Sequence, residues 1–145
     1  MLRKKRMWQT AGILLLLVAL LSGCGKYNPF QQLGVSNKEV PDYQVSGEVF
    51  HEQKVGDQDV KAVWATVNVK GFSEEQAKKV IADYISKQME KRNFISVIVK
   101  ETKTEKKKLM YEGMYFGNKE AASMAGKDVR KIEKFPVIFY NKIEK

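Results

Sequence analysis

The stretch "FSEEQAKKVIADYISKQM", residues 72–89, decides the fold that the sequence predicts. Ser73 followed three residues later by Gln76 has the pattern of a capping box, and Phe72 is placed to pack against Ala77. Beyond this start, apolar residues recur with the 3.6-residue period of one helix face: Ala77, Val80, Ile81, Tyr84, Ile85 and Met89. The stretch therefore predicts an amphipathic helix that buries one face against a sheet.

Segments rich in β-branched and aromatic residues lie on both sides of this helix. Residues 43–53 and 59–71 predict a hairpin that turns around Val55-Gly56-Asp57. After the helix, residues 94–102 and 108–116 predict two strands, residues 118–126 a short helix, and residues 136–143 a last strand. The expected fold class is α+β: one mostly antiparallel sheet of about five strands, with one principal amphipathic helix and a short second helix.

The N-terminal residues have the order of a secretory signal. Four basic residues at positions 3–6 precede an apolar run from Ala11 to Leu21 and the small residues Ser22 and Gly23. The apolar run is shorter than the roughly 20 residues that a membrane-spanning helix needs. Leu21-Ser22-Gly23-Cys24 resembles the lipobox of bacterial lipoproteins. That resemblance implies a diacylglycerol group on the thiol of Cys24 and cleavage just before it; the alternative is a buried apolar cysteine.

This resemblance divides the chain into three parts. Residues 1–23 are expected to be the lipoprotein signal peptide, residues 24–41 the lipidated cysteine with a flexible tether, and residues 42–145 a single α+β domain. The alternative for the tether is that Tyr27, Phe30 and Leu33 pack on the domain. The expected location is the cell membrane, with the domain held on the extracytoplasmic face by its lipid.

Residue types that carry chemistry are sparse in this chain. His51 is the only histidine, and no nucleophile is identified for a His51–Glu52 dyad to activate. A group of carboxylates around the first turn lacks the spacing of a calcium loop: Glu48, Glu52, Asp57 and Asp59. No phosphate-binding glycine loop, nucleophile elbow or dinucleotide fingerprint is present. We therefore expect no catalytic activity, no cofactor and no metal site.

Two surfaces are candidates for binding. The chain has 26 lysines and arginines against 17 acidic residues, and some of the lysines lie together between two predicted strands: Lys103, Lys106, Lys107 and Lys108. Such a cluster suits anionic lipid headgroups or a wall polyanion, or is simply a solvated turn. The second surface is the sheet face that the long helix does not cover, with Trp64, Met110, Met114, Ile138 and Tyr140. The short helix, sheet curvature or a partner is expected to cover that face.

The sequence favours a non-catalytic interaction module, anchored by lipid outside the cytoplasm, that binds an envelope protein or a cell-wall component. The chain resembles small bacterial envelope lipoproteins with a signal, a tether and an α+β domain. Nucleic acid is not an expected partner, because the anchor places the domain outside the cytoplasm. The alternative is a small ligand-binding or hydrolytic domain without a recognisable motif. A deep pocket with convergent polar groups would favour that alternative, and a flat or apolar sheet face would favour the interaction module.

Overall fold

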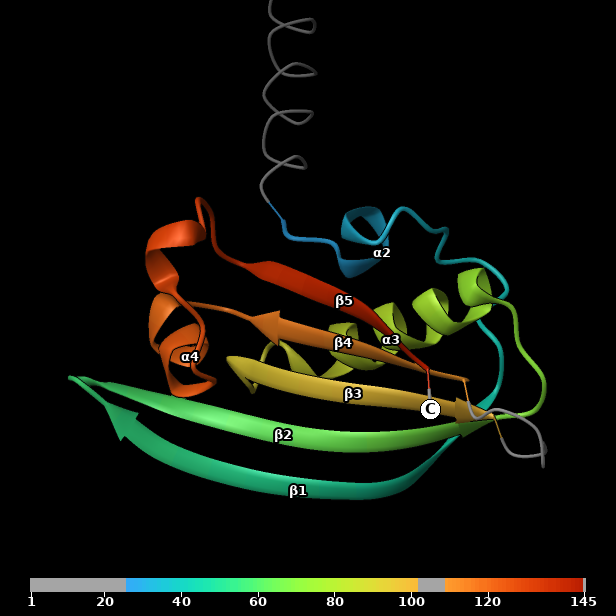
Figure 1. The fold of residues 1–145 in the computed structure, drawn as a ribbon, viewed down its shortest axis with the longest axis horizontal. Coiled ribbons are helices and arrows are strands. Elements are labelled where there is room, and N and C mark those ends of the chain that lie inside the picture. The colour runs from blue at the N-terminus through green and yellow to red at the C-terminus, as the bar shows by residue number, and fades with distance from the viewer. Residues whose placement is uncertain (1–25, 102–108, 145) are drawn as a thin grey trace, which may run out of the picture.

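A computed structural model describes residues 26–101 and 109–144 of the chain. One five-stranded sheet carries helices on both faces (Figure 1). The elements follow one another as α2 (Pro29–Gln32), β1 (Tyr43–Val55), β2 (Gln58–Val69), α3 (Glu74–Gln88), β3 (Phe94–Glu101), β4 (Leu109–Phe116), α4 (Lys119–Met124), the 3₁₀ helix η1 (Val129–Lys131) and β5 (Val137–Glu144). The predicted α+β class is confirmed.

The strands lie in the order β1-β2-β3-β4-β5, so each strand pairs with its neighbours in sequence. Only β2 and β3 are parallel, because α3 carries the chain back across the sheet between them. The other three pairs are antiparallel, and β1 and β5 form the two edges. The sheet is therefore mostly antiparallel, as predicted.

Helix α3 starts at the predicted capping box. The Ser73 side chain accepts a hydrogen bond from the Gln76 backbone N–H at 3.3 Å, and the Gln76 side chain accepts one from the Ser73 N–H at 2.9 Å. The apolar face of α3 is buried on β2, β3 and β4, whose inward side chains include Val63, Val67, Ile95 and Val97. This packing forms the larger of two cores.

The smaller core lies on the other face of the sheet, under α4. The predicted cap Asn118 accepts a hydrogen bond from the Ala121 N–H at 2.9 Å, and Ala121 and Ala122 are fully buried. They pack with Val60, Ala62, Phe94 and Phe116. The short helix thus covers one part of the second face, as one of the expected alternatives proposed.

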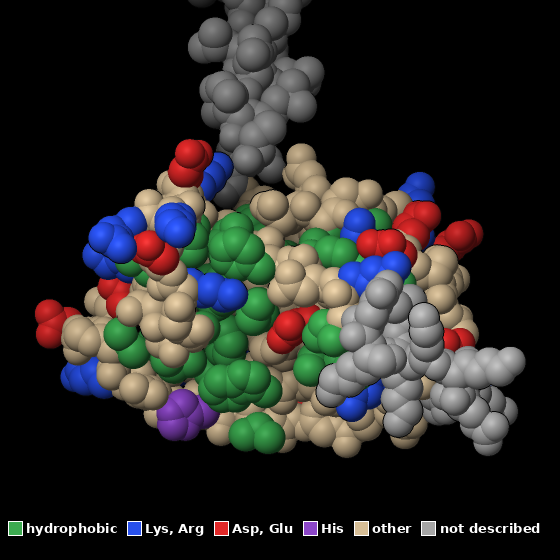
Figure 2. Space-filling view, viewed as in Figure 1, with side chains coloured by type: hydrophobic (Ala, Val, Ile, Leu, Met, Phe, Trp, Pro, Cys, Tyr) green, Lys and Arg blue, Asp and Glu red, His purple; other side chains and the backbone are tan. Residues whose placement is uncertain are grey.

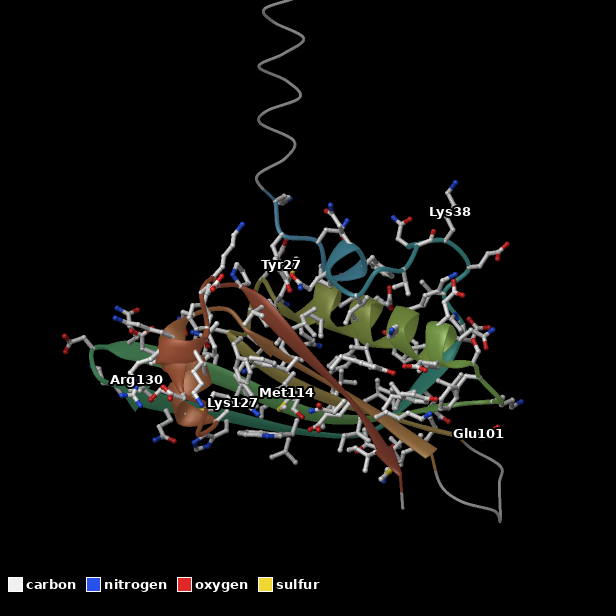
Figure 3. All side chains as sticks on the ribbon, turned by 45° about the horizontal axis from the view of Figure 1, so that its top comes forward. Tyr27, Lys38, Glu101, Met114, Lys127 and Arg130 are labelled. Atoms are coloured by element: carbon white, nitrogen blue, oxygen red, sulfur yellow. The ribbon has the colours of Figure 1, made fainter. Side chains whose placement is uncertain are left out.

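The segment before β1 packs on the domain, which for Tyr27 and Leu33 is the alternative to the flexible tether expected over residues 24–41. Asn28 caps the short helix α2, and Tyr27 and Leu33 pack against the larger core. Tyr27 lies beside α2 (Figure 3). Its ring is 5.8 Å from the Tyr115 ring, measured between centroids. Packing removes the apolar area of these side chains from water, and this free energy favours the packed segment over a solvated one. Cys24 lies outside the described residues.

Side chains on α3 hold the edge strand β1, which the helix itself does not cover. The Tyr43 hydroxyl donates to Asp83 at 2.7 Å, and the Tyr84 hydroxyl donates to Glu48 at 2.6 Å. Apart from Tyr43 and Val55 at its two ends, the residues of β1 are exposed. Within the described part of the chain, no helix is long and apolar enough to cross a membrane.

Candidate functional site

The strand register assigns each predicted sheet-face residue to one side of the sheet. Trp64 pairs with Val49 and Ser96, Ser96 with Met114, and Met114 with Phe139. This row therefore crosses all five strands on the face opposite α3, which we call the Trp64 face. Met110 lies on the same face and is 8% exposed. The predicted positions of Trp64, Met110 and Met114 on this face agree with the register.

Tyr140 and Ile138 lie on the other face, which corrects their predicted position. Tyr140 pairs with Gly113, and its hydroxyl donates to Glu74 at the start of α3 at 3.0 Å. Ile138 belongs to the core under α3. Side chains alternate along a strand, so the pairing of β5 with β4 decides the face, and that pairing is not visible in the sequence.

The Trp64 face contains a hollow of about 480 Å³. We call it the Ser96 hollow, because the small side chain of Ser96 separates Trp64 from Met114 in the row across the sheet. Its walls include Trp64, Ile98, Glu112, Met114 and Met124. Hydrophobic side chains gather on this face beside α4, with an acidic side chain among them (Figure 2). The hollow is thus apolar with a few polar groups.

Trp64 is the exposed aromatic wall of the Ser96 hollow. The Trp64 and Phe94 rings pack edge to face, with 5.2 Å between their centroids. The centroid of the His51 ring lies 6.3 Å from that of Trp64. The residue is nevertheless 39% exposed. A large ring that is held by its neighbours and open to solvent is the kind of residue that carries interface energy.

Ser96 and Glu112 are the polar pair of the hollow. Ser96 is the one buried polar residue among the described residues, at 5% exposure. Its hydroxyl donates to the Glu112 carboxylate at 3.3 Å. His51, which was considered with Glu52 as a dyad, contacts the Gln53 side chain at 3.4 Å. Neither contact joins a hydroxyl nucleophile to an imidazole base, which acyl-transfer chemistry of the serine type requires.

Exposed large hydrophobic residues of the described chain all lie on β1 or β2: Val45, Val49, Phe50 and Trp64. Val49 is 63% exposed and neighbours Trp64 in the row across the sheet. Phe50, 51% exposed, lies on the α3 face under the Arg92 guanidinium, 4.6 Å from the ring centroid. The apolar surface therefore continues from the Ser96 hollow to the edge of the sheet.

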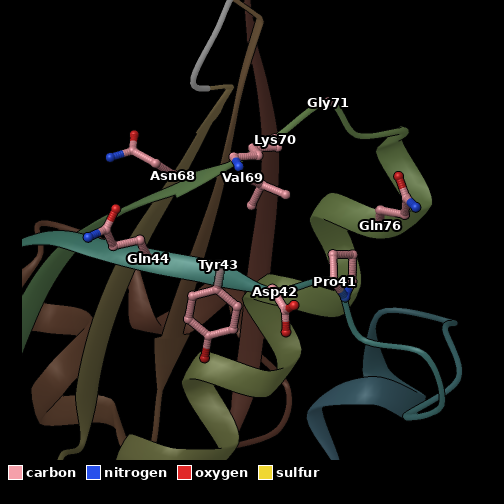
Figure 4. A pocket seen from close by; sticks show the side chains of 9 residues that line it. All are labelled: Pro41, Asp42, Tyr43, Gln44, Asn68, Val69, Lys70, Gly71 and Gln76. Atoms are coloured by element: carbon pink, nitrogen blue, oxygen red, sulfur yellow. The ribbon is translucent and has the colours of Figure 1, made fainter.

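A second hollow, of about 530 Å³, lies where β1 begins and β2 ends (Figure 4). Asp42 and Lys70 on its walls carry opposite charges, and Gln44, Asn68 and Gln76 add neutral amides. Its Tyr43 hydroxyl is already bound to Asp83. Burial, followed by that hydrogen bond, raises the pKa of Tyr43. These walls favour neither a cation nor an anion, so the Ser96 hollow is the better candidate.

The carboxylates around the first turn do not gather into a metal site. Glu48 accepts the Tyr84 hydroxyl on the α3 face, and the Asp59 carbonyl accepts the Asn93 side chain at 3.1 Å. Over residues 26–101 and 109–144, no three or more histidine, cysteine or acidic side chains could hold one ion. The predicted lysine cluster, Lys103 with residues 106–108, lies outside the described residues.

Sequence reasoning missed Ser96, Glu112 and Met124. Ser96 and Glu112 are single polar residues in the apolar strands "FISVIV" and "LMYEGMYF", which is the one sign the sequence contains. Comparison with protein-family models, with curated proteins and with solved structures finds no match to this chain. The arguments about function therefore rest on the geometry and on the N-terminal sequence.

Proposed function

We propose that this protein is a lipid-anchored interaction module on the extracytoplasmic face of the cell membrane. It binds another envelope protein or a cell-wall component through the Trp64 face and catalyses no reaction. Diacylglycerol on Cys24 provides the anchor. The proposal takes its location from the lipobox-like sequence Leu21-Ser22-Gly23-Cys24 and its binding surface from the exposed apolar side chains beside the Ser96 hollow.

The position of Tyr27 supports a close attachment to the membrane. Cys24 precedes Tyr27 by three residues, which span at most about 10 Å of extended chain. Tyr27 is packed on the core beside α2, and α2 lies on the side of the molecule opposite β1 (Figure 1). A lipid on Cys24 would hold that side near the headgroups and leave the β1 edge turned away from the membrane. The exposed residues Val49 and Trp64 would then remain accessible to a partner.

The observation that carries the binding proposal is the 39% exposure of Trp64 in a row that also contains the exposed Val49. In protein interfaces, a few residues contribute most of the binding free energy, and aromatic residues are enriched among them. The polar pair Ser96–Glu112 favours a second candidate, a domain that binds a small ligand in the Ser96 hollow.

Photo-crosslinking in cells tests the binding face. A photoreactive amino acid at Gln53, an exposed wall residue of the Ser96 hollow, is expected to give an adduct of one defined mass with a macromolecule. The adduct should disappear when Trp64→Ala is added, because the anchor residue of the interface is lost. The matched control places the same group at the exposed Glu90, after α3, and should give no such adduct. Equal adducts from both positions, or an adduct that survives Trp64→Ala, would contradict the proposed face.

A further inference from the structure

We infer that the Ser96 hollow receives an arginine side chain of the partner protein. The guanidinium pairs with the Glu112 carboxylate and stacks against Trp64. This inference rests on the proposed function, because it names the chemistry by which a protein partner is recognised at that face. It follows from the shape of the hollow, from its charge and from its aromatic wall.

The shape comes from one small side chain in a row of large ones. Across the sheet, the row on this face is Val49, Trp64, Ser96, Met114 and Phe139. Ser96 leaves open the space that a larger residue would fill, and the hollow of about 480 Å³ lies there. That volume is in the range of protein sites that enclose a ligand group. The hollow is therefore large enough to take a long side chain end-on.

The charge comes from Glu112, a partly buried carboxylate among apolar side chains. A carboxylate has about four positions that accept hydrogen bonds, and within the described residues only the Ser96 hydroxyl donates to it, at 3.3 Å. A carboxylate with so few protein donors can accept further hydrogen bonds from a partner. Because Glu112 accepts and cannot donate while ionised, a cationic donor group complements it.

The aromatic wall selects arginine over lysine. Trp64 is held by Phe94 on one side, yet it remains 39% exposed to the hollow and the solvent. A guanidinium is planar, so it can lie on an indole face while its N–H groups pair with a carboxylate in two parallel hydrogen bonds. An ammonium group offers a point charge without that plane. The combination of an indole and a carboxylate in one hollow therefore fits a guanidinium best.

Of the described residues, Lys127 and Lys100 lie on the same face, and neither is ion-paired with Glu112. The Lys127 ammonium lies over the ring of Phe139 on β5, 5.5 Å from its centroid. Lys100 is exposed and one row beyond Glu112 along β3. Both lysines repel a cation that approaches the hollow from β5 or along β3. A guanidinium therefore approaches from Trp64 and the β1 edge. Lys127 thereby provides a matched control.

Calorimetric titration of the full-length protein in a mild detergent tests the inference. The probes are the acetylated, amidated peptides Thr-Val-Arg-Val-Thr and Thr-Val-citrulline-Val-Thr, since citrulline keeps the shape of arginine without its charge. We expect the arginine peptide to bind saturably and about tenfold more tightly than the citrulline peptide, and the lysine analogue to fall between them. Glu112→Gln should remove the preference for arginine over citrulline. Lys127→Gln should keep or increase that preference, because it removes a repelling positive charge and leaves the Glu112 carboxylate in place.

Filling the hollow provides an independent variant. Ser96→Val should weaken both peptides while the melting temperature shows that the protein remains folded. The inference is overturned if the arginine peptide does not bind at concentrations up to about 5 mM, if both peptides bind equally, or if Glu112→Gln leaves the preference unchanged. If the adduct from Gln53 also persists in Glu112→Gln, the Trp64 face remains the binding surface and only the arginine site is wrong.

Discussion

Gly113 on β4 lies directly beneath Ile81 on α3, and a Cβ atom at Gly113 would overlap with the Cγ2 methyl of Ile81. The absence of a side chain at this point lets the helix approach the sheet. Both residues are buried, and Ile81 belongs to the larger core and is 0% exposed. Gly113 is thus required by the close approach of two elements rather than by a turn.

We expect Gly113→Ala to destabilise the protein by about 1–3 kcal/mol, because the added methyl group overpacks the contact with Ile81. Chemical denaturation followed by circular dichroism measures the change. Gly47→Ala is the control, since nothing lies within 4 Å of a Cβ at Gly47. A similar loss of stability in the two variants would mean that the helix does not approach β4 this closely. In the double variant with Ile81→Ala, the cost of Gly113→Ala should fall.

A charge on the buried face of α3 tests the larger core as a whole. Ile81→Asp is expected to cost about 3–5 kcal/mol, because it buries an unpaired carboxylate and removes a fully buried side chain. Residues 42–145 without the N-terminal segment should show the same loss if they fold as one domain. Lys91→Asp, at an exposed position just after the helix, is the control. A thermal melt of Ile81→Asp at an unchanged temperature would contradict the assigned face.

High pH is expected to destabilise the protein through its tyrosines. Burial, and then the hydrogen bond to Glu48, raises the pKa of Tyr84 in the folded state, and burial followed by Asp83 does the same for Tyr43. The unfolded chain therefore loses these protons first, near the ordinary pKa of about 10. Stability is fully present below that pH and is lost as the pH rises through and above it.

The measurement is the denaturation midpoint of wild type and Tyr84→Phe between about pH 8 and pH 11. Both proteins carry the same lysines, which titrate in the same range, so their difference isolates the tyrosine. Tyr84→Phe should be less stable than wild type at pH 8, because the hydrogen bond to Glu48 is lost. It should then lose less stability on going to high pH. Parallel curves for the two proteins would show that Tyr84 does not contribute.

The fold was largely predictable because its signals are local. The capping box at Ser73, the helix period through Met89 and the turn at Gly56 each lie within a few neighbouring residues. The face of Tyr140 was not predictable, because it depends on the pairing of β5 with β4. The packing of Tyr27 was predicted only as an alternative, because a segment with proline, glycine and amides has no hydrophobic period that indicates where it packs.

The candidate site was predictable only in part. Trp64 and Met114 were expected on one face, and the register agrees. The Ser96 hollow was not expected, because it arises where a small residue on β3 stands between larger residues on β2 and β4. No contiguous stretch of sequence contains that arrangement. A single polar residue in an apolar strand indicates that a site is possible, but the neighbouring strands determine what it can bind.

The lipid anchor is tested by labelling cells with a fatty-acid analogue. Wild type should be labelled and Cys24→Ser should not, because the chain contains one thiol for the diacylglycerol group. A conservative change at Ser22→Ala, which keeps a small residue before the cysteine, is the control and should still be labelled. Equal labelling of wild type and Cys24→Ser would contradict the anchor and, with it, the proposed location.

The last prediction ranks the two binding surfaces. If partner binding depends on the Trp64 face, Trp64→Ala should abolish binding by full-length protein and added salt should reduce it only modestly, because most of the energy comes from buried apolar area. If binding depends instead on the lysine cluster, changing Lys106, Lys107 and Lys108 to Gln should weaken association with anionic vesicles or wall polymer, and salt should mimic the change. We expect the first result, because exposed charges contribute little to an interface compared with a packed aromatic residue. Loss of function in the triple glutamine variant, with fold and function both retained in Trp64→Ala, would reverse this ranking.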